Sequence, residues 1–141
     1  NQISFPGGKV EKEDANKYQT ALRETEEEIG IKSSSIEYGG ELSEIYIPPS
    51  NFLVSAFVGI CIEVPVFVKD EKEVKEILEI PLSDLFDPTI EKETRVKLKG
   101  EFQLKTPYLE LNKSVVWGAT AAILAEFKSI LKGKLTLFQK D

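Results

Sequence analysis

The chain has 141 residues, 41% of them apolar, and a net charge of −6 from 18 basic and 24 acidic residues. These values are typical of a single globular domain and argue against nucleic-acid binding, which requires clustered basic residues. No apolar run approaches the roughly 20 residues of a membrane-spanning helix. We therefore expect neither nucleic acid nor membrane among the partners.

Histidine and cysteine usage narrows the possible chemistry. The chain contains no histidine, which excludes Ser-His and Cys-His catalysis and leaves acid–base steps to carboxylates, Lys or Tyr. Cys61 is the single cysteine, so no intrachain disulfide can form, and we expect a core thiol and a cytoplasmic location. Because the chain begins at Asn1 rather than Met, we expect it to start inside a longer protein; a lost organellar signal stays an alternative.

The first half of the chain predicts one helix among strands. Residues 2–5 are predicted as a strand end before a Pro/Gly loop, and residues 14–29 as a helix. Asp14 is its predicted N-cap and Gly30 its predicted stop. The apolar residues of this helix recur at i, i+4, i+7 and i+11: Tyr18, Leu22, Thr25 and Ile29. A strand-like stretch over residues 36–47, interrupted by Gly39-Gly40, and a central strand over residues 52–64 follow.

The second half predicts strands followed by a long helix. A charged loop leads into a strand near residue 80, residues 83–86 form a helical turn capped by Ser83, and residues 89–111 hold two or three strands. An amphipathic helix then ends at Gly133, with Trp117 in the core. Strands flanked by helices without βαβ alternation predict one α/β domain over residues 1–141, with a mixed central sheet between helices.

Four glutamates crowd the stretch RETEEEIG, residues 23–30. Helical geometry places Glu24, Glu27 and Glu28 within an arc of about 100° and leaves Glu26 as a surface charge. Like charges at i, i+4 cost roughly 0.2–0.5 kcal/mol, and carboxylates in the last turns oppose the helix dipole. The face is either a solvated charge cluster or a site for Mg²⁺ or Mn²⁺, which prefer carboxylate oxygens.

The segment GGKVEKEDANKYQTALRETEEEIGI, from Gly7 to Ile31, resembles the Nudix box GX5EX7REUXEEXGU, in which U is apolar. The matching positions are Gly8, Arg23, Glu24, Glu27, Glu28, Gly30 and Ile31. Asp14 replaces the first Glu, eight residues rather than seven separate it from Arg23, and Thr25 occupies a U position. The longer spacing, together with QISFPGG, YIPPSNF and VWGATAAIL, is similar to the coenzyme A diphosphatase branch.

This resemblance implies a Nudix-type α/β/α sandwich that lacks its N-terminal strand or strands. It implies hydrolysis of a nucleoside-diphosphate-linked small molecule with Mg²⁺ or Mn²⁺, and a possible homodimer. Glu24, Glu27 and Glu28 would be metal ligands, with Glu24 also the leading candidate for general base. Arg23 would orient Glu24 through a charge-assisted hydrogen bond.

Further contacts are predicted outside the helix. The backbone carbonyl of Gly7 could approach a metal, and a later loop could supply Glu73, or Glu71 in reserve, although either could be an ordinary solvated charge. Residues expected to contact substrate are Lys9, Ser50, Asn51, Phe52 and Arg95. A simple β-turn explains PPSN equally well.

Three functional hypotheses follow. The first is hydrolysis of coenzyme A or a derivative to 3′,5′-ADP and a phosphopantetheine. The second keeps the mechanism but takes ADP-ribose, a nucleotide sugar or a dinucleoside polyphosphate. The third is a Nudix-fold binding module without catalysis, against which the intact acidic pattern argues.

Overall fold

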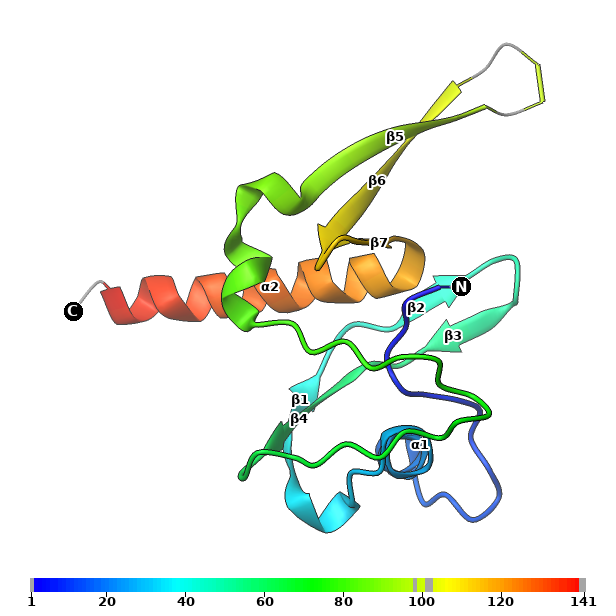
Figure 1. Ribbon diagram of the computed structural model, residues 1–141, viewed down its shortest axis with the longest axis vertical. Coiled ribbons are helices and arrows are strands. Elements are labelled where there is room, and N and C mark those ends of the chain that lie inside the picture. The colour runs from blue at the N-terminus through cyan, green and yellow to red at the C-terminus, as the bar shows by residue number, and fades with distance from the viewer. Residues whose placement is uncertain (1, 98, 101–102, 140–141) are drawn as a thin grey trace. The chain divides into compact units, whose positions relative to one another are not determined.

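The computed structural model describes residues 2–97, 99–100 and 103–139, and its chain divides into two compact units (Figure 1). The N-terminal unit comprises Phe5–Leu78; the C-terminal unit comprises Asn1–Ser4 and Glu79–Asp141. Within the described residues, no helix combines the length and apolar character needed to cross a membrane.

The N-terminal unit contains one α-helix and two small antiparallel sheets. Its elements are α1 (Lys17–Ile29), the 3-10 helix η1 (Ser33–Ser35), β1 (Ile36–Glu41), β2 (Ile45–Ile47), β3 (Phe52–Val54) and β4 (Phe57–Cys61). Strand β1 pairs with β4 and β2 pairs with β3. The β1–β4 register shifts between Tyr38 and Gly40, which is where the sequence predicts an interruption. The predicted strand over residues 52–64 is therefore two strands with different partners.

Helix α1 begins later than the sequence predicts. Asn16 is the N-cap, and its side chain accepts a hydrogen bond from the Gln19 amide at 2.9 Å. The prediction of Asp14 as N-cap is wrong, because the Asp14 carboxylate is bound by Arg23 instead. The predicted stop at Gly30 is confirmed by its left-handed φ of 75° and by its amide, which donates to the Glu26 carbonyl at 3.0 Å.

Helix α1 packs against the β1–β4 sheet through aromatic and aliphatic side chains. The Tyr18 ring lies 5.0 Å from the ring of Tyr38 and 5.4 Å from that of Phe57, measured between centroids. Leu22, from the predicted apolar face, is buried. Burial of this face leaves the glutamates of α1 on other sides of the helix, as its period requires.

A distant segment completes the C-terminal end of α1. The amides of Val68 and Asp70 donate to the carbonyls of Ile29 and Glu28 at 3.0 and 2.9 Å, which satisfies carbonyls that a helix end leaves unpaired. A Cβ atom at Gly30 would lie 2.8 Å from the Val68 carbonyl oxygen and from its Cβ. Only glycine allows this close approach together with a positive φ.

The C-terminal unit is a three-stranded antiparallel sheet with a long helix. Its elements are the 3-10 helices η2 (Leu82–Phe86) and η3 (Pro88–Ile90), then β5 (Glu91–Lys97), β6 (Gln103–Leu111), β7 (Ser114–Val116) and α2 (Gly118–Gln139). Strands β5 and β6 form the long hairpin of Figure 1, and β7 pairs with β6. The core consists of Leu85, Ile90, Leu111 and Val116, against which residues of α2 and the N-terminal Ile3 pack.

The structure confirms the expected α/β content, and all the strand pairs that it describes are antiparallel. The helical turn near residue 84 is confirmed, but the Ser83 cap is wrong, since no side chain caps η2. No strand forms at residues 2–5 or 76–81. Helix α2 continues past Gly133 to Gln139, because a glycine within a helix costs only about 1 kcal/mol. A single domain over residues 1–141 stays a prediction.

Two leucines of η2 test where the C-terminal core lies. Leu85 is 3% exposed and Leu82 is 53% exposed. We expect Leu85→Ala to lower the free energy of unfolding by about 2–5 kcal/mol, because it empties a packed position. Leu82→Ala is the matched control and should change it by no more than about 0.5 kcal/mol. Urea denaturation measures both, and equal losses would contradict this core.

Candidate active site

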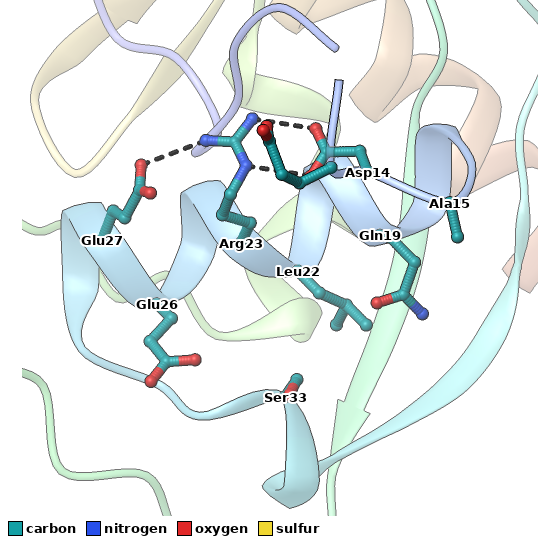
Figure 2. A pocket seen from close by; sticks show the side chains of 9 residues that line it. Asp14, Ala15, Gln19, Leu22, Arg23, Glu26, Glu27 and Ser33 are labelled. Carbon is teal, nitrogen blue, oxygen red and sulfur yellow. Dashed lines mark hydrogen bonds and ion pairs between the residues drawn. The ribbon is translucent and has the colours of Figure 1, made fainter. Parts of the chain in front are cut away.

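Arg23 of α1 is held by a two-point ion pair with Asp14 (Figure 2). Its Nε and Nη2 atoms donate to the two Asp14 carboxylate oxygens, each at 3.0 Å. The Asp14 side chain is only 6% exposed and also accepts bonds from the Glu11 amide and the Thr20 hydroxyl. Arg23 is the main cause that holds the pKa of Asp14 well below its usual range. Sequence reasoning missed this partnership, although the displaced acid at position 14 signalled it.

The same guanidinium positions two of the predicted catalytic glutamates. Arg23 Nη1 lies 3.1 Å from Glu24 Oε1 and 3.2 Å from Glu27 Oε2, and Nη2 donates to the Lys9 carbonyl at 3.1 Å. The hydrogen bond expected between Arg23 and Glu24 is therefore present. The metal-binding and catalytic roles of these residues stay predictions.

The glycine loop lies directly against the carboxylates of α1. A Cβ atom at Gly8 would lie 2.6 Å from the Glu24 carboxyl carbon, whereas one at Gly7 would meet nothing within 4 Å. The Gly7 amide donates a long hydrogen bond of 3.4 Å to Glu28 Oε1. Gly8 is thus the position where the loop requires a residue without a Cβ atom. The sequence did not distinguish this requirement at Gly8 from the one expected at Gly7.

Glu28 lies in a partly buried position beside other acids. Burial is the main cause that raises the pKa of Glu28, and the nearby charges of Glu24 and Glu73 raise it further. Glu73 follows directly after the segment that completes the end of α1. Glu71, the reserve prediction, instead forms an ion pair with Lys69 at 3.1 Å and is 78% exposed. Glu71 is thus engaged by Lys69, whereas the charge of Glu73 acts on Glu28; a metal-binding role for either stays a prediction.

These acids fit a divalent cation in donor chemistry and charge. Glu24 and Glu73 each act on Glu28 as like charges, and a hard cation would offset that repulsion with the oxygen ligands it prefers. In the described part of the chain, however, no three acidic, Cys or His groups already stand in metal-binding positions. The residues fit Mg²⁺ or Mn²⁺ by chemistry rather than by preset ligand distances.

A polar hollow of about 450 Å³ opens along α1 beside the Arg23 network (Figure 2). Its lining residues are Glu13, Asp14, Ala15, Gln19, Leu22, Arg23, Glu26, Glu27 and Ser33. Glu26 is exposed at this hollow, in agreement with its prediction as a surface charge. Glu24 and Glu28 are not among the lining residues, so the hollow and the glycine-loop face are different surfaces of the helix.

The predicted substrate contacts divide into three groups. Lys9 and Phe52 touch, with the Lys9 Nζ atom 5.2 Å from the Phe52 ring centroid. Ser50 and Asn51 have turn roles, since Ser50 Oγ donates to the Ile47 carbonyl and Asn51 Oδ1 accepts from Tyr46. Arg95 lies on β5 in the C-terminal unit, and its contact with substrate stays a prediction.

Neither of the two side chains predicted to lie in the core, Trp117 and Cys61, is fully buried. Trp117, expected in the core, is 51% exposed, so that prediction is wrong. The sequence predicts Trp117 at the start of the C-terminal helix, but α2 begins only at Gly118, whose φ of 65° is left-handed, so Trp117 is not part of the apolar face of the helix. Cys61 is only half-buried, at the end of the short strand β4.

A glycine loop against a helix that carries Arg23, Glu24, Glu27 and Glu28 is the arrangement expected of a Nudix-type site. A family model described as the NUDIX domain matches residues 1–99, and the chain belongs to the Nudix family. It is similar to the uncharacterized Nudix hydrolase NudL of Pectobacterium atrosepticum, at 34% identity over 87% of this chain and 63% of that protein.

Other relatives carry a more specific name. The mitochondrial coenzyme A diphosphatase NUDT8 of Homo sapiens is 32% identical over 86% of this chain and 52% of its own length. The protein of the same name from Mus musculus is 29% identical over 86% of this chain and 59% of its own length. The chain thus spans between about half and two-thirds of the length of these relatives.

The glycine pair provides a test of how the loop supports the acids. We expect Gly8→Ala to displace the Glu24 carboxylate and to weaken Mn²⁺ binding about tenfold or more, as changes next to metal ligands commonly do. Gly7→Ala is the matched control and should bind Mn²⁺ within twofold of the parent, because its Cβ meets no neighbour. Titration calorimetry measures both affinities, with circular dichroism to verify folding. Equal effects of the two substitutions would contradict the role of Gly8.

The lowered pKa of Asp14 predicts a pH dependence of stability. A carboxylate whose pKa is lower when folded contributes stability that is complete above its unfolded pKa, near 3.9, and is lost as the pH falls toward the folded value. The parent should therefore lose stability between about pH 4 and pH 2 more steeply than Asp14→Asn, which should already be less stable at pH 7. Urea midpoints at several pH values measure this. Parallel curves would contradict it.

Proposed function

We propose that this protein hydrolyses the diphosphate bond of coenzyme A or a coenzyme A derivative, giving 3′,5′-ADP and a phosphopantetheine, with Mg²⁺ or Mn²⁺. The observation that carries the proposal is the similarity to the NUDT8 diphosphatases across most of this chain. The Arg23 network supports it, because it holds in place the carboxylates that such a reaction requires.

In this proposal Glu24, Glu27 and Glu28 hold the metal, with Glu73 and the Gly7 backbone as additional contacts. The bound ion would offset the charge of the diphosphate and make a water molecule more acidic. Glu24 accepts the proton of the attacking water, whose oxygen adds to phosphorus as the bridging P–O bond breaks. Its carboxylate suits this role because it is only 14% exposed and is oriented by Arg23.

Arg23 acts as a positioning residue. Its two-point pair with Asp14 fixes the guanidinium plane, and that plane fixes where Nη1 meets Glu24 and Glu27. A lysine could not satisfy all of these partners, because its ammonium is a single point charge. The bond from Nη2 to the Lys9 carbonyl also holds the glycine loop against α1.

The same site chemistry would serve other diphosphates. The NudL relative is itself uncharacterized by name, and the NUDIX domain match does not distinguish substrates. ADP-ribose, nucleotide sugars and dinucleoside polyphosphates therefore remain the alternative substrates, and a non-catalytic binding module remains the alternative function. A cytoplasmic location and a homodimer stay predictions, and the NUDT8 relatives are mitochondrial by name.

A substrate panel with Mg²⁺ tests the proposal. We expect coenzyme A to be cleaved to 3′,5′-ADP and phosphopantetheine, resolved by chromatography, and Glu24→Gln or Glu28→Gln to lower kcat by about 100-fold or more. Glu26→Gln, on the same helix but exposed, is the control and should retain activity within twofold. Intact coenzyme A beside cleaved ADP-ribose would overturn the substrate. Undiminished turnover in Glu28→Gln would overturn the site.

A further inference from the structure

We propose that Lys9 and Phe52 form a recognition pair for the nucleotide half of the substrate, in which Lys9 binds a phosphate and Phe52 stacks on the base. This inference rests on the proposed function for its substrate class. It concerns a different contact, however: the glycine loop and the tip of the β2–β3 hairpin, rather than the acids of α1.

Lys9 is placed to supply a positive charge beside the acidic face. Its carbonyl accepts from Arg23 Nη2 at 3.1 Å, and the same guanidinium contacts Glu24 through Nη1. Its ammonium has no carboxylate within 4 Å among the residues that the structure describes, and it lies over the Phe52 ring. An ammonium that is not committed to an ion pair is available to a phosphate oxygen.

The β2–β3 hairpin holds Phe52 in a fixed position. Its tip is fixed by the 2.7 Å bond from the Tyr46 hydroxyl to Asn51 Oδ1, with Asn51 in a left-handed conformation at φ 57°. The base of the hairpin is joined to α1 by Glu44, whose Oε1 atom lies 3.0 Å from Lys17 Nζ and accepts from Ser55 at 3.2 Å. Phe52 itself is 46% exposed, so part of its ring remains open to a ligand.

The contact between the two side chains couples the two recognition steps. A cation–π contact at an exposed site is weak, whereas a charge-assisted bond to phosphate is stronger. A phosphate would therefore draw Lys9 away from the Phe52 ring and expose the face of that ring. Every nucleobase can stack on such an aromatic face. A ligand with both groups gains from both contacts, and a ligand without a base gains only from Lys9.

Calorimetric binding of ADP and of inorganic pyrophosphate, both in Mg²⁺, separates the two roles. We expect Phe52→Leu to weaken ADP about tenfold and to leave pyrophosphate within twofold, and Phe52→Trp to restore ADP binding. Leu53→Ala is the matched control, because this neighbour is 54% exposed and points to the opposite face of the strand. It should leave both ligands within twofold.

Lys9 should behave differently from Phe52. We expect Lys9→Gln to weaken ADP and pyrophosphate to a similar extent, about tenfold, and Lys9→Arg to restore most of the affinity for both. Unchanged ADP affinity in Phe52→Leu would overturn the proposal, as would equal losses of ADP and pyrophosphate in that variant. Because these are binding measurements, the expected pattern without cleavage of coenzyme A would refute the proposed function alone. Cleavage without the pattern would refute the recognition pair alone.

Discussion

The ion pair between Arg23 and Asp14 is the interaction on which the candidate site depends. Asp14 takes two of the guanidinium nitrogens at 3.0 Å each, so the remaining donor directions are fixed by the planarity of the group. Those directions reach Glu24, Glu27 and the Lys9 carbonyl. The Arg23 guanidinium thereby offsets the mutual repulsion of the nearby carboxylates and joins the glycine loop to α1.

A second constraint acts at the other end of α1. Gly30 allows the segment around Val68 to approach the helix end closely, and the Val68 and Asp70 amides pair with its last carbonyls. This contact fixes the start of the loop that carries Glu73, whose charge acts on Glu28. The acids near the end of α1 thus have two separate supports, one from Arg23 and one from a distant segment.

Local patterns predicted much of the helix and little of its surroundings. The period of Leu22 and its neighbours and the stop at Gly30 depend on nearby residues, and both agree with the structure. The start of α1 differs because a tertiary partner, Arg23, competes for Asp14. In the same way, the apolar run 52–64 gave no sign that its two halves pair with different strands, since partner choice is not a local property.

The candidate site likewise has features that local spacing determines and features that only tertiary contacts determine. The Arg23–Glu24 bond follows from adjacency and is present. The helical spacing of Glu24, Glu27 and Glu28 did not show that, in the described part of the chain, no three acids stand in metal-binding positions. The charge interaction between Glu73 and Glu28 and the contact of Lys9 with Phe52 depend on how loops fold back onto α1. No helical or strand period records such contacts, so only the structure could reveal them.

The dependence of α1 on Val68 and Asp70 has a consequence for the order of folding. A helix of 13 residues is marginal in water by itself, and these partners for its last carbonyls come about forty residues further along the chain. Because closing that loop costs conformational entropy, we expect the contacts of Val68 and Asp70 with α1 to form late in folding. Release of this one segment would separate Glu73 from Glu28 while the Arg23 network persists, which defines a local opening reaction distinct from global unfolding.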